Sequence, residues 1–344
     1  MKELKTVKDV EDFRIEEGRV FYSATHEEIV SGVTSDLYFV RTRELLRQAG
    51  KDRSQVVAEI FPTRPGLLCG TEEAAGMLRG KAVSVWAIPE GVEVGAKDVV
   101  MRIDGPYDEF AMYETALLGI LASSSGWATA SRECRKAAGD KPVYSFGARH
   151  LHPAVAPVME RAAVIGGADN CSCILGAKLL GREPSGTVPH AAVLLMGDTV
   201  KTALLYDQIM PAAAPRIILV DTFKDEAEET LRVAEALGDR LDGVRLDTPG
   251  ERGGVTPGLV QEIRARLNLG GFSKVKILVS GGITPERISL LASVGADAFG
   301  VGSYISSARP IDMTMDIKEI EGRALAKRGR VPGVTPSPRL VRYI

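Results

Sequence analysis

The chain carries VSGGITPERI at residues 279–288 and GADAFGVGS at residues 295–303. In each segment, glycines directly follow an apolar run, where two consecutive strands of a parallel sheet are expected to end. Glycine lets backbone N–H groups approach an anion closely, and a following helix adds the positive end of its dipole. Two such turns on the last strands of a barrel are typical of a phosphate site. The groups expected on the phosphate are Ser280, Gly281, Gly282, Gly302 and Ser303.

A simpler interpretation is that these glycines serve only the tight turns between strand and helix. The pattern occurs in both turns, at the spacing of one βα unit, and this favours the phosphate site. Aldolases, isomerases and synthases built on barrels share the signature, however. The two turns therefore predict a phosphorylated small molecule and leave the reaction open.

From about residue 142 the chain alternates between apolar β-like runs and helical stretches. Such a rhythm predicts parallel strands covered by helices, and six units indicate an irregular or incomplete barrel rather than an eight-fold one. The expected strands are 142–145, 173–176, 216–220, 243–246, 275–280 and 298–301. The expected helices are 153–166, 196–209, 224–237, 256–268 and 285–294.

The first part of the chain has a different texture, with short β-like runs between Gly and Pro turns. Those runs are expected at 19–22, 56–61, 82–87 and 99–103. A helical stretch follows over 110–136, with an expected break near Ser123–Gly126. The final 35 residues lose the βα rhythm and are expected to return to the first part. The predicted class is α/β, with an α+β domain over 1–115 joined by 311–344, and a barrel over 116–310.

Composition narrows the classes of protein. The 344 residues are 45% hydrophobic and 26% charged, which is typical of a folded globular protein. The formal net charge of −2 gives no indication of binding to nucleic acid or to an anionic membrane. The sequence has no apolar run long enough to predict a membrane span, and its charged first residues do not resemble a signal peptide. The four cysteines show no CxxC pairing, so we expect neither a zinc site nor any other resident metal. These features are typical of a cytoplasmic enzyme.

Polar segments mark several expected strand ends. They are SGVTSDLYFVRT (31–42), FPTRPG (61–66), YSFGARH (144–150), SGTVPHA (185–191), VDTF (220–223) and VRLDTPG (244–250). In this order, ahead of the two glycine turns, they resemble the nicotinate phosphoribosyltransferase family, in its shorter prokaryotic branch. The resemblance runs from about residue 30 to 305. It implies a type II phosphoribosyltransferase fold and a dimer, or a higher homo-oligomer, whose active sites borrow residues from the partner subunit.

The resemblance also implies a reaction. Nicotinate and phosphoribosyl pyrophosphate would give nicotinate mononucleotide and pyrophosphate, with Mg²⁺ accompanying the phosphoribosyl substrate and ATP as a co-substrate. Such a site needs a slot for a flat anionic ring, a cradle for the 5′-phosphate and positive charge near the leaving group.

Residues matching the family's base slot can be named. Phe146 matches the aromatic ring on which the pyridine stacks, and Tyr38 matches the ring that covers the other face from the partner subunit. Arg149 matches an arginine lining the substrate site, and Arg245 one at the base. The alternative for Phe146 is plain core packing.

Three further residues match groups at the sugar and the phosphates. Asp247 corresponds to the family's ribose carboxylate, and Arg64 to a partner-subunit arginine directed at phosphates. Thr187, in SGTVPHA, is expected to contact substrate. The alternative for the charged residues, Arg245 included, is an ordinary salt-bridged strand end.

His190 ends the same segment, which resembles the family's GTxxH motif, whose histidine is transiently phosphorylated by ATP. The alternative is a structural or capping histidine. Nicotinamide-using relatives carry an aspartate where this chain has Val188, which cannot accept a hydrogen bond from an amide. That difference favours nicotinate.

Other functions stay open. Quinolinate phosphoribosyltransferase, which also decarboxylates its product, shares the phosphate and ribose motifs. A barrel isomerase or aldolase on a sugar phosphate would need a Schiff-base lysine or a paired acid and base, and the strand ends offer Arg245, Asp247 and Asp221 but no lysine. A catalytically idle relative that binds pyridine nucleotides is a third alternative.

Overall fold

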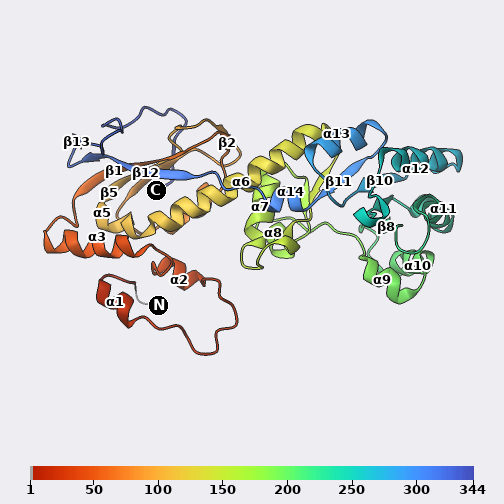
Figure 1. The fold of residues 1–344 in the computed structure, drawn as a ribbon, viewed down its shortest axis with the longest axis horizontal. Coiled ribbons are helices and arrows are strands. Elements are labelled where there is room, and N and C mark those ends of the chain that lie inside the picture. Colours follow the sequence, from red (N-terminus) through yellow and green to blue (C-terminus); the bar gives the residue numbers. More distant parts are fainter. Residues whose placement is uncertain (1–2) are drawn as a thin grey trace. The chain divides into compact units, whose positions relative to one another are not determined.

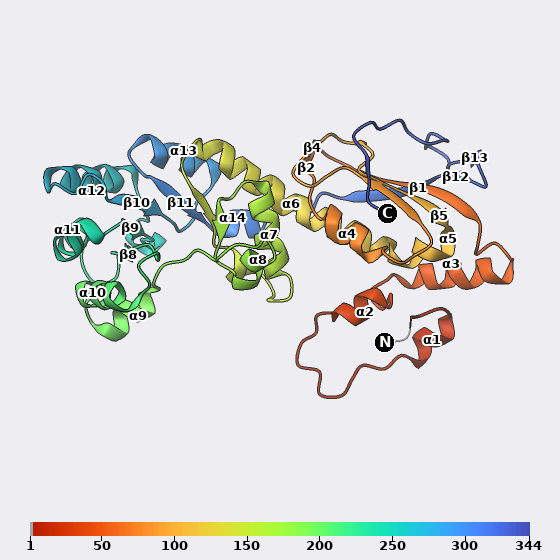
Figure 2. The ribbon, with the colours of Figure 1, turned by 180° about the vertical axis from the view of Figure 1, so that it is seen from behind.

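The structure, a computed structural model, describes residues 3–344 and divides into two compact units. The first unit comprises Met1–Thr129 with Arg309–Ile344, and the second comprises Ala130–Ala308. Both are drawn in Figure 1 and, from behind, in Figure 2. No described helix has the length and apolarity that a membrane span requires.

The first unit contains a six-stranded antiparallel sheet in the order β13-β12-β1-β5-β3-β14. Its strands are β1 (Gln55–Pro62), β3 (Ser84–Ala87), β5 (Met101–Pro106), β12 (Met313–Ile320), β13 (Arg323–Ala324) and β14 (Val341–Arg342). A small second sheet pairs β2 (Gly66–Leu67) with β4 (Glu93–Val94). Because β12 pairs directly with β1, the C-terminal residues complete a sheet begun near the N-terminus, as predicted.

Helices cover one face of this sheet, as Figures 1 and 2 show. They are α4 (Thr71–Met77), α5 (Tyr107–Phe110), the short 3₁₀ turn η1 (Ala111–Tyr113) and the first part of α6 (Glu114–Ala138). Along β5 every second residue is buried, so Met101 and Ile103 face these helices and pack with Leu117 and Leu121 of α6. Three more helices precede β1: α1 (Val7–Asp12), α2 (His26–Val30) and α3 (Leu37–Gln48).

Two sequence expectations for this unit are wrong. Helix α6 is continuous through Ser123–Gly126, because the small residues there serve close packing. A Cβ on Gly126 would lie 2.5 Å from the carbonyl oxygen of Arg309, so the helix accepts the returning chain only at a glycine. Residues 19–22 form a loop and not a strand, with the Arg19 guanidinium bonded to the Phe21 and Ser23 carbonyls and to Glu28.

The second unit is built on a parallel sheet in the order β7-β6-β11-β10-β9-β8. The strands are β6 (Val143–Ser145), β7 (Asn170–Cys171), β8 (Ile217–Leu219), β9 (Gly243–Leu246), β10 (Lys276–Val279) and β11 (Ala298–Val301). The described edge strands β7 and β8 do not pair with each other, so the barrel stays half open. The predicted α/β class, an irregular barrel with an α+β domain made from both chain ends, is confirmed.

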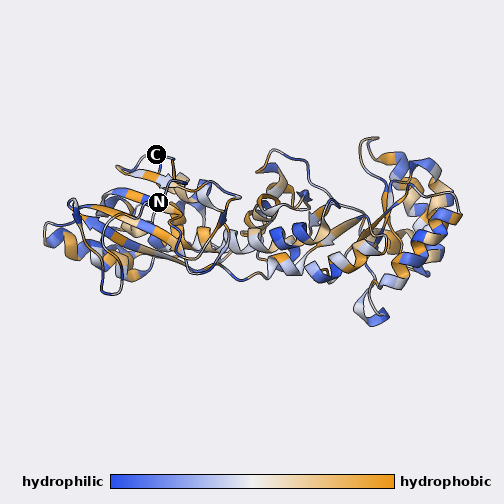
Figure 3. Ribbon diagram, turned by 90° about the horizontal axis from the view of Figure 1, so that it is seen from above, coloured by the Kyte–Doolittle hydropathy of each residue, from blue (hydrophilic) through white to orange (hydrophobic). Residues whose placement is uncertain are grey.

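Helices alternate with these strands. They are α7 (Ala156–Gly166), α8 (Ile174–Lys178), α9 (His190–Met196), α10 (Thr199–Ile209), α11 (Glu226–Leu237), α12 (Pro257–Leu269), α13 (Pro285–Ser293) and α14 (Ser303–Ser306). Three 3₁₀ turns are η2 (Ala148–His150), η3 (Gly238–Arg240) and η4 (Gly250–Arg252). In Figure 3 hydrophobic and hydrophilic residues alternate along the helices, as expected of helices that cover a sheet on one side only.

Two expectations for the second unit also need correction. The strand predicted at 173–176 is the start of helix α8, and the strand β7 lies just before it. Gly176 lets α8 pack closely, because a Cβ there would lie 2.9 Å from Cβ of Glu160. The helix predicted at 196–209 is confirmed as α10 but begins at Thr199, since Gly197, with a φ of +74°, ends α9 and the Asp198 carboxylate then caps α10 through the Lys201 N–H.

Candidate active site

The polar residues singled out in the second half of the sequence gather at one edge of the second unit's sheet. Parallel strands end on the same side, so residues at or just after their carboxyl ends become neighbours. Phe146 follows β6, Asp247 follows β9, Ser280 follows β10 and Gly302 follows β11. Arg245 lies within β9, two residues before Asp247, and therefore faces the same side.

Arg245 ties three of these segments together. Its guanidinium donates to Ser280 Oγ at 2.8 Å, to Thr187 Oγ1 at 2.9 Å and to Asp247 Oδ2 at 3.2 Å. Ser280 Oγ in turn donates to the other carboxylate oxygen of Asp247 at 2.7 Å. A guanidinium holds such a fork rigidly because it is planar and stays charged. The structure thus brings together four residues from three segments that are far apart in sequence.

Phe146 lies next to this network. The Arg245 Cζ atom is 5.2 Å from the centre of the Phe146 ring, which is within cation–π range. The ring is also stacked on Tyr144 at 6.5 Å, with 13° between the ring planes. Space for it comes from Gly300 of β11, where a Cβ would lie 2.3 Å from Cε2 of Phe146. Sequence reasoning missed Gly300, because only the folded sheet shows what faces it.

The two glycine turns border the same network. Gly281 and Gly282 have φ values of +84° and +60°, which a residue with a side chain rarely adopts. A Cβ on Gly281 would come within 3.2 Å of Asp247 Oδ1. At the second turn, a Cβ on Gly302 would lie 2.8 Å from Cε1 of His150, and Ser303 begins α14 with its side chain exposed. Gly281, Gly282 and Ser303 are exposed and Gly302 is half-buried, so backbone N–H groups at both strand ends are open to an anion.

His190 is the first residue of α9, and its Nε2 atom lies 3.0 Å from Oδ2 of Asp221. The Asp221 side chain is 1% exposed, and its second oxygen, Oδ1, is buried and has no hydrogen-bond partner among residues 3–344. Burial raises the pKa of Asp221, His190 opposes that shift, and the charge of Asp247 adds to it. Asp221 was not predicted as a partner of His190, although it belongs to the polar VDTF segment.

A second residue missed by sequence reasoning is Glu160, which is 0% exposed on α7. Its Oε1 atom accepts hydrogen bonds from Ser145 Oγ and from the N–H groups of Gly147 and Ala148. Its Oε2 atom accepts from the N–H groups of Ser172 and Cys173. Burial raises the pKa of Glu160 and these donors oppose the shift. One carboxyl group thus shapes both the loop that carries Phe146 and the loop after β7.

Three predicted residues lie outside the network. Arg149 is exposed on η2, three residues after Phe146. Tyr38 and Arg64 belong to the first unit: Tyr38 is 56% exposed on α3, and the Arg64 guanidinium donates to the Arg309 carbonyl at 2.9 Å. Their roles stay predictions. Among residues 3–344, no cluster of three or more His, Cys, Asp or Glu side chains is arranged to hold a metal ion.

Comparison with known proteins gives the family. The model for the N-terminal domain of quinolinate phosphoribosyl transferase matches residues 36–125, and the model for its C-terminal domain matches 127–316. The chain belongs to the quinolinate phosphoribosyl transferase family. The similarity to nicotinate phosphoribosyltransferases seen in the sequence is a more distant relationship within the same type II group.

Individual members of the group bear different names. The chain is 46% identical to nicotinate-nucleotide pyrophosphorylase from Pyrococcus furiosus, with a TM-score of 0.87 over 92% of this chain and 82% of that one. It is 30% identical to nicotinate phosphoribosyltransferase pncB2 of Mycobacterium tuberculosis, over 71% of this chain and 53% of the relative. A probable carboxylating nicotinate-nucleotide pyrophosphorylase of Methanothermobacter thermautotrophicus is 23% identical, over 78% and 90%. The chain spans about half the length of the curated nicotinate phosphoribosyltransferases it matches.

We expect Glu160→Gln to lower the free energy of unfolding by about 1–3 kcal/mol. The amide nitrogen would face N–H donors that now point at a carboxylate oxygen, so buried donors would lose their acceptor. Denaturant unfolding measures the change. The exposed Glu262, which forms an i,i+4 ion pair with Arg266 on α12, provides the control, and Glu262→Gln should change stability by no more than about 0.5 kcal/mol. Equal effects of the two substitutions would contradict the role given to Glu160.

Proposed function

We propose that this family member is a nicotinate phosphoribosyltransferase, which forms nicotinate mononucleotide and pyrophosphate from nicotinate and phosphoribosyl pyrophosphate. The observation that carries the proposal is the fixed position of the Arg245 guanidinium, beside the Phe146 ring and bonded to Asp247. A cation next to an aromatic ring suits a flat base with one carboxylate, and a carboxylate next to it suits a ribose.

In this proposal the pyridine ring stacks on Phe146 and its carboxylate reaches Arg245, with Arg149 as a second cation at the entrance. Tyr38 of a second copy of the chain would cover the other face of the base, and Arg64 of that copy would meet the phosphates. The active form would therefore be a homodimer or a larger assembly. Val188, which cannot accept a hydrogen bond from an amide, supports nicotinate over nicotinamide.

The chemical step is a displacement at C1 of the ribose. The bond from C1 to the pyrophosphate oxygen breaks, and the ring nitrogen of nicotinate forms a new bond to C1. Asp247 stabilises the positive charge that develops on the ribose, while Ser280, Gly281, Gly282, Gly302 and Ser303 hold the 5′-phosphate. Mg²⁺ would accompany phosphoribosyl pyrophosphate, bound by its phosphates and by water, and would supply positive charge near the leaving pyrophosphate.

We further propose that ATP drives the reaction through His190. Because Nε2 of His190 can donate its hydrogen to Asp221, the lone pair of Nδ1 is left free to attack the γ-phosphorus of ATP. A P–N bond then forms as the P–O bond to ADP breaks, and water later hydrolyses the phosphohistidine. Thr187, three residues before His190, is bonded to Arg245 and so connects this histidine to the base slot.

Quinolinate is the second candidate substrate, and the two family models and the Methanothermobacter relative favour it. Quinolinate carries two carboxylates, of which one leaves as CO₂ after the ring nitrogen is joined to the ribose. Both would need cations, and Arg245 and Arg149 are the candidates. This reaction has no need of ATP, so the role of His190 separates the two proposals.

A product assay decides between the substrates. Purified protein is given Mg²⁺ and phosphoribosyl pyrophosphate with nicotinate, nicotinamide or quinolinate in turn, each with and without ATP. We expect nicotinate mononucleotide from nicotinate, in larger amount with ATP, and no nucleotide from nicotinamide. Product from quinolinate alone, with release of CO₂, would establish the second candidate instead.

The substitution His190→Ala tests the coupling to ATP. We expect it to abolish the stimulation by ATP and the associated ATP hydrolysis, and to leave slow ATP-independent product formation, because the base and ribose contacts lie on other residues. His26→Ala, at an exposed position on α2, is the matched control and should retain full stimulation. Undiminished stimulation in His190→Ala would remove the phosphohistidine from the mechanism.

Gly300→Ala tests the base slot. The added methyl group would overlap Cε2 of Phe146 and displace its ring, so we expect KM for nicotinate to rise roughly tenfold to a hundredfold. KM for phosphoribosyl pyrophosphate should change much less. Gly258→Ala on α12, where a Cβ meets nothing closer than 4.0 Å, is the control. Because the same methyl group would also lie 3.1 Å from Cβ of Ser280, the KM for nicotinate decides the test, and an unchanged value would show that Phe146 does not hold the base.

A further inference from the structure

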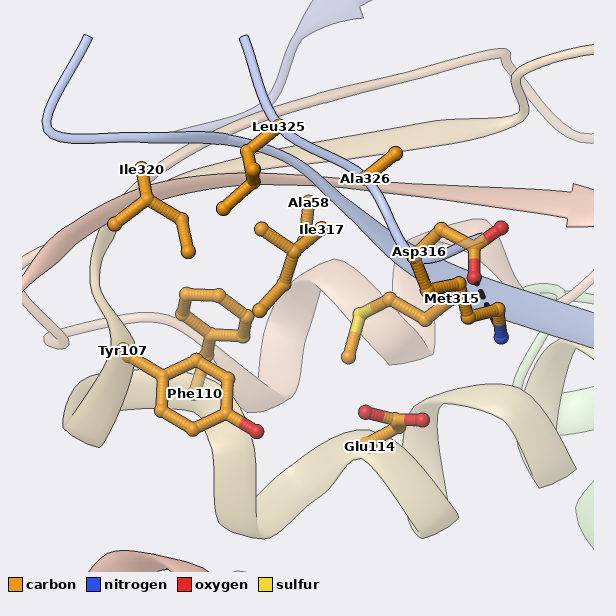
Figure 4. A pocket seen from close by; sticks show the side chains of 11 residues that line it. Ala58, Tyr107, Phe110, Glu114, Met315, Asp316, Ile317, Ile320, Leu325 and Ala326 are labelled. Atoms are coloured by element: carbon orange, nitrogen blue, oxygen red, sulfur yellow. Dashed lines mark ion pairs between the residues drawn. The ribbon is translucent and has the colours of Figure 1, made fainter. Parts of the chain in front are cut away.

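A cavity of about 460 Å³ lies within the first unit, which does not contain the Arg245 network. Figure 4 shows its walls. Residues of α5 and α6 form one side, and residues of β1, of β12 and of the segment just after β13 form the other. The volume is in the range of pockets that hold small organic molecules.

One end of this cavity is apolar. Phe110 lies on its floor beside the ring of Tyr107, and Ile317, Ile320 and Leu325 face them from the opposite side, as Figure 4 shows. Leu325 is 53% exposed, so this apolar wall is reachable from solvent. An apolar body of a ligand could be buried here and gain free energy from the water it displaces.

The other end of the cavity is polar and carries two carboxyl groups, Asp316 and Glu114, of which only Asp316 has cationic partners within the described chain. Asp316 has two cations, since Lys327 Nζ lies 3.0 Å from one of its carboxylate oxygens and Arg330 Nε 2.8 Å from the other. Glu114, the first residue of α6, points into the cavity in Figure 4 and has no hydrogen bond or ion pair with any of residues 3–344. Lys327 and Arg330 both pair with Asp316, and Glu114 has no such partner among the described residues.

The lack of a partner for the Glu114 carboxyl group is unusual because the group is half-buried and lies near other acidic residues. The pKa of Glu114 is raised to about 7, mainly by burial; the charge of Lys327 opposes this rise, and the charges of Asp316 and Asp36 contribute to it. The charge of Glu114 also contributes to the raised pKa values of the Tyr38 and Tyr107 hydroxyls. A half-buried carboxyl group without a partner is costly, and an apolar residue would fill this place at lower cost. The position therefore suits a ligand that supplies the missing positive charge.

We propose that this cavity is a binding site for a small organic amine, whose ammonium group pairs with Glu114 while its apolar body lies against Phe110, Ile317 and Ile320. The cavity shares no lining residue with the site proposed for phosphoribosyl transfer. A neutral apolar molecule, or an apolar side chain from a second copy of the chain, would fill the same space without needing the carboxylate, and the experiment separates these cases.

Three probes of similar shape and different charge test the proposal: 2-phenylethylamine, 2-phenylethanol and 3-phenylpropanoate. Binding to the full chain is measured by titration calorimetry at pH 6 and pH 8. We expect the amine to bind at least roughly tenfold more tightly than the alcohol at pH 8, and the propanoate not to bind. Amine affinity should rise roughly tenfold from pH 6 to pH 8, because a carboxyl with a pKa near 7 ionises over that interval.

Two variants locate the site. Glu114→Gln should lose the preference for the amine and its dependence on pH, while still binding 2-phenylethanol in the apolar end. Glu235→Gln, at an exposed carboxylate on α11, should behave as the unaltered chain. Equal affinity for amine and alcohol, no binding of any probe, or amine binding that survives in Glu114→Gln would each overturn the proposal. The charge and pH comparisons on the unaltered chain decide the question even where Glu114→Gln does not fold.

Discussion

The hydrogen bonds of Arg245 hold the candidate active site together. One guanidinium reaches Ser280 after β10, Thr187 in the loop before α9 and Asp247 after its own strand, so three chain segments depend on a single side chain. Because the group is planar and permanently charged, it sets the direction of each contact as well as its presence. The Phe146 ring then takes its place against this fixed cation.

Two residues outside this hydrogen-bond network, Gly300 and Glu160, allow Phe146 to take that position. Gly300 leaves the volume that the Phe146 ring occupies, and Glu160 holds the loop in which Phe146 sits by accepting hydrogen bonds from its backbone. Neither needs to touch a substrate. Both support the site from within the barrel. Gly300 does so by leaving space on strand β11, and Glu160 by placing a buried hydrogen-bond acceptor on helix α7.

The family contains proteins named for nicotinate and proteins named for the carboxylating reaction on quinolinate, and this chain is related to both. The roles proposed for the two glycine turns and for Asp247 suit either substrate, because each reaction transfers the same phosphoribosyl group. The difference must lie in the number of cations that meet the base and in whether a histidine takes part. In the function proposed above, Arg245, Arg149 and the pair formed by His190 and Asp221 are the residues on which that difference would depend.

Sequence alone determined the α/β class, five of the six parallel strands, the return of the C-terminal residues to the first sheet, and most candidate residues at the strand ends. These follow from local patterns, since apolar runs, glycine turns and strand-end polar segments are readable without partners. The tertiary structure alone decided that Asp221 meets His190, that Gly300 faces Phe146, that Glu160 anchors two loops and that α6 continues through Ser123–Gly126. Each of these depends on residues brought together from distant segments, and local propensity carries no information about which distant group fills the space beside a glycine or pairs with a buried carboxylate.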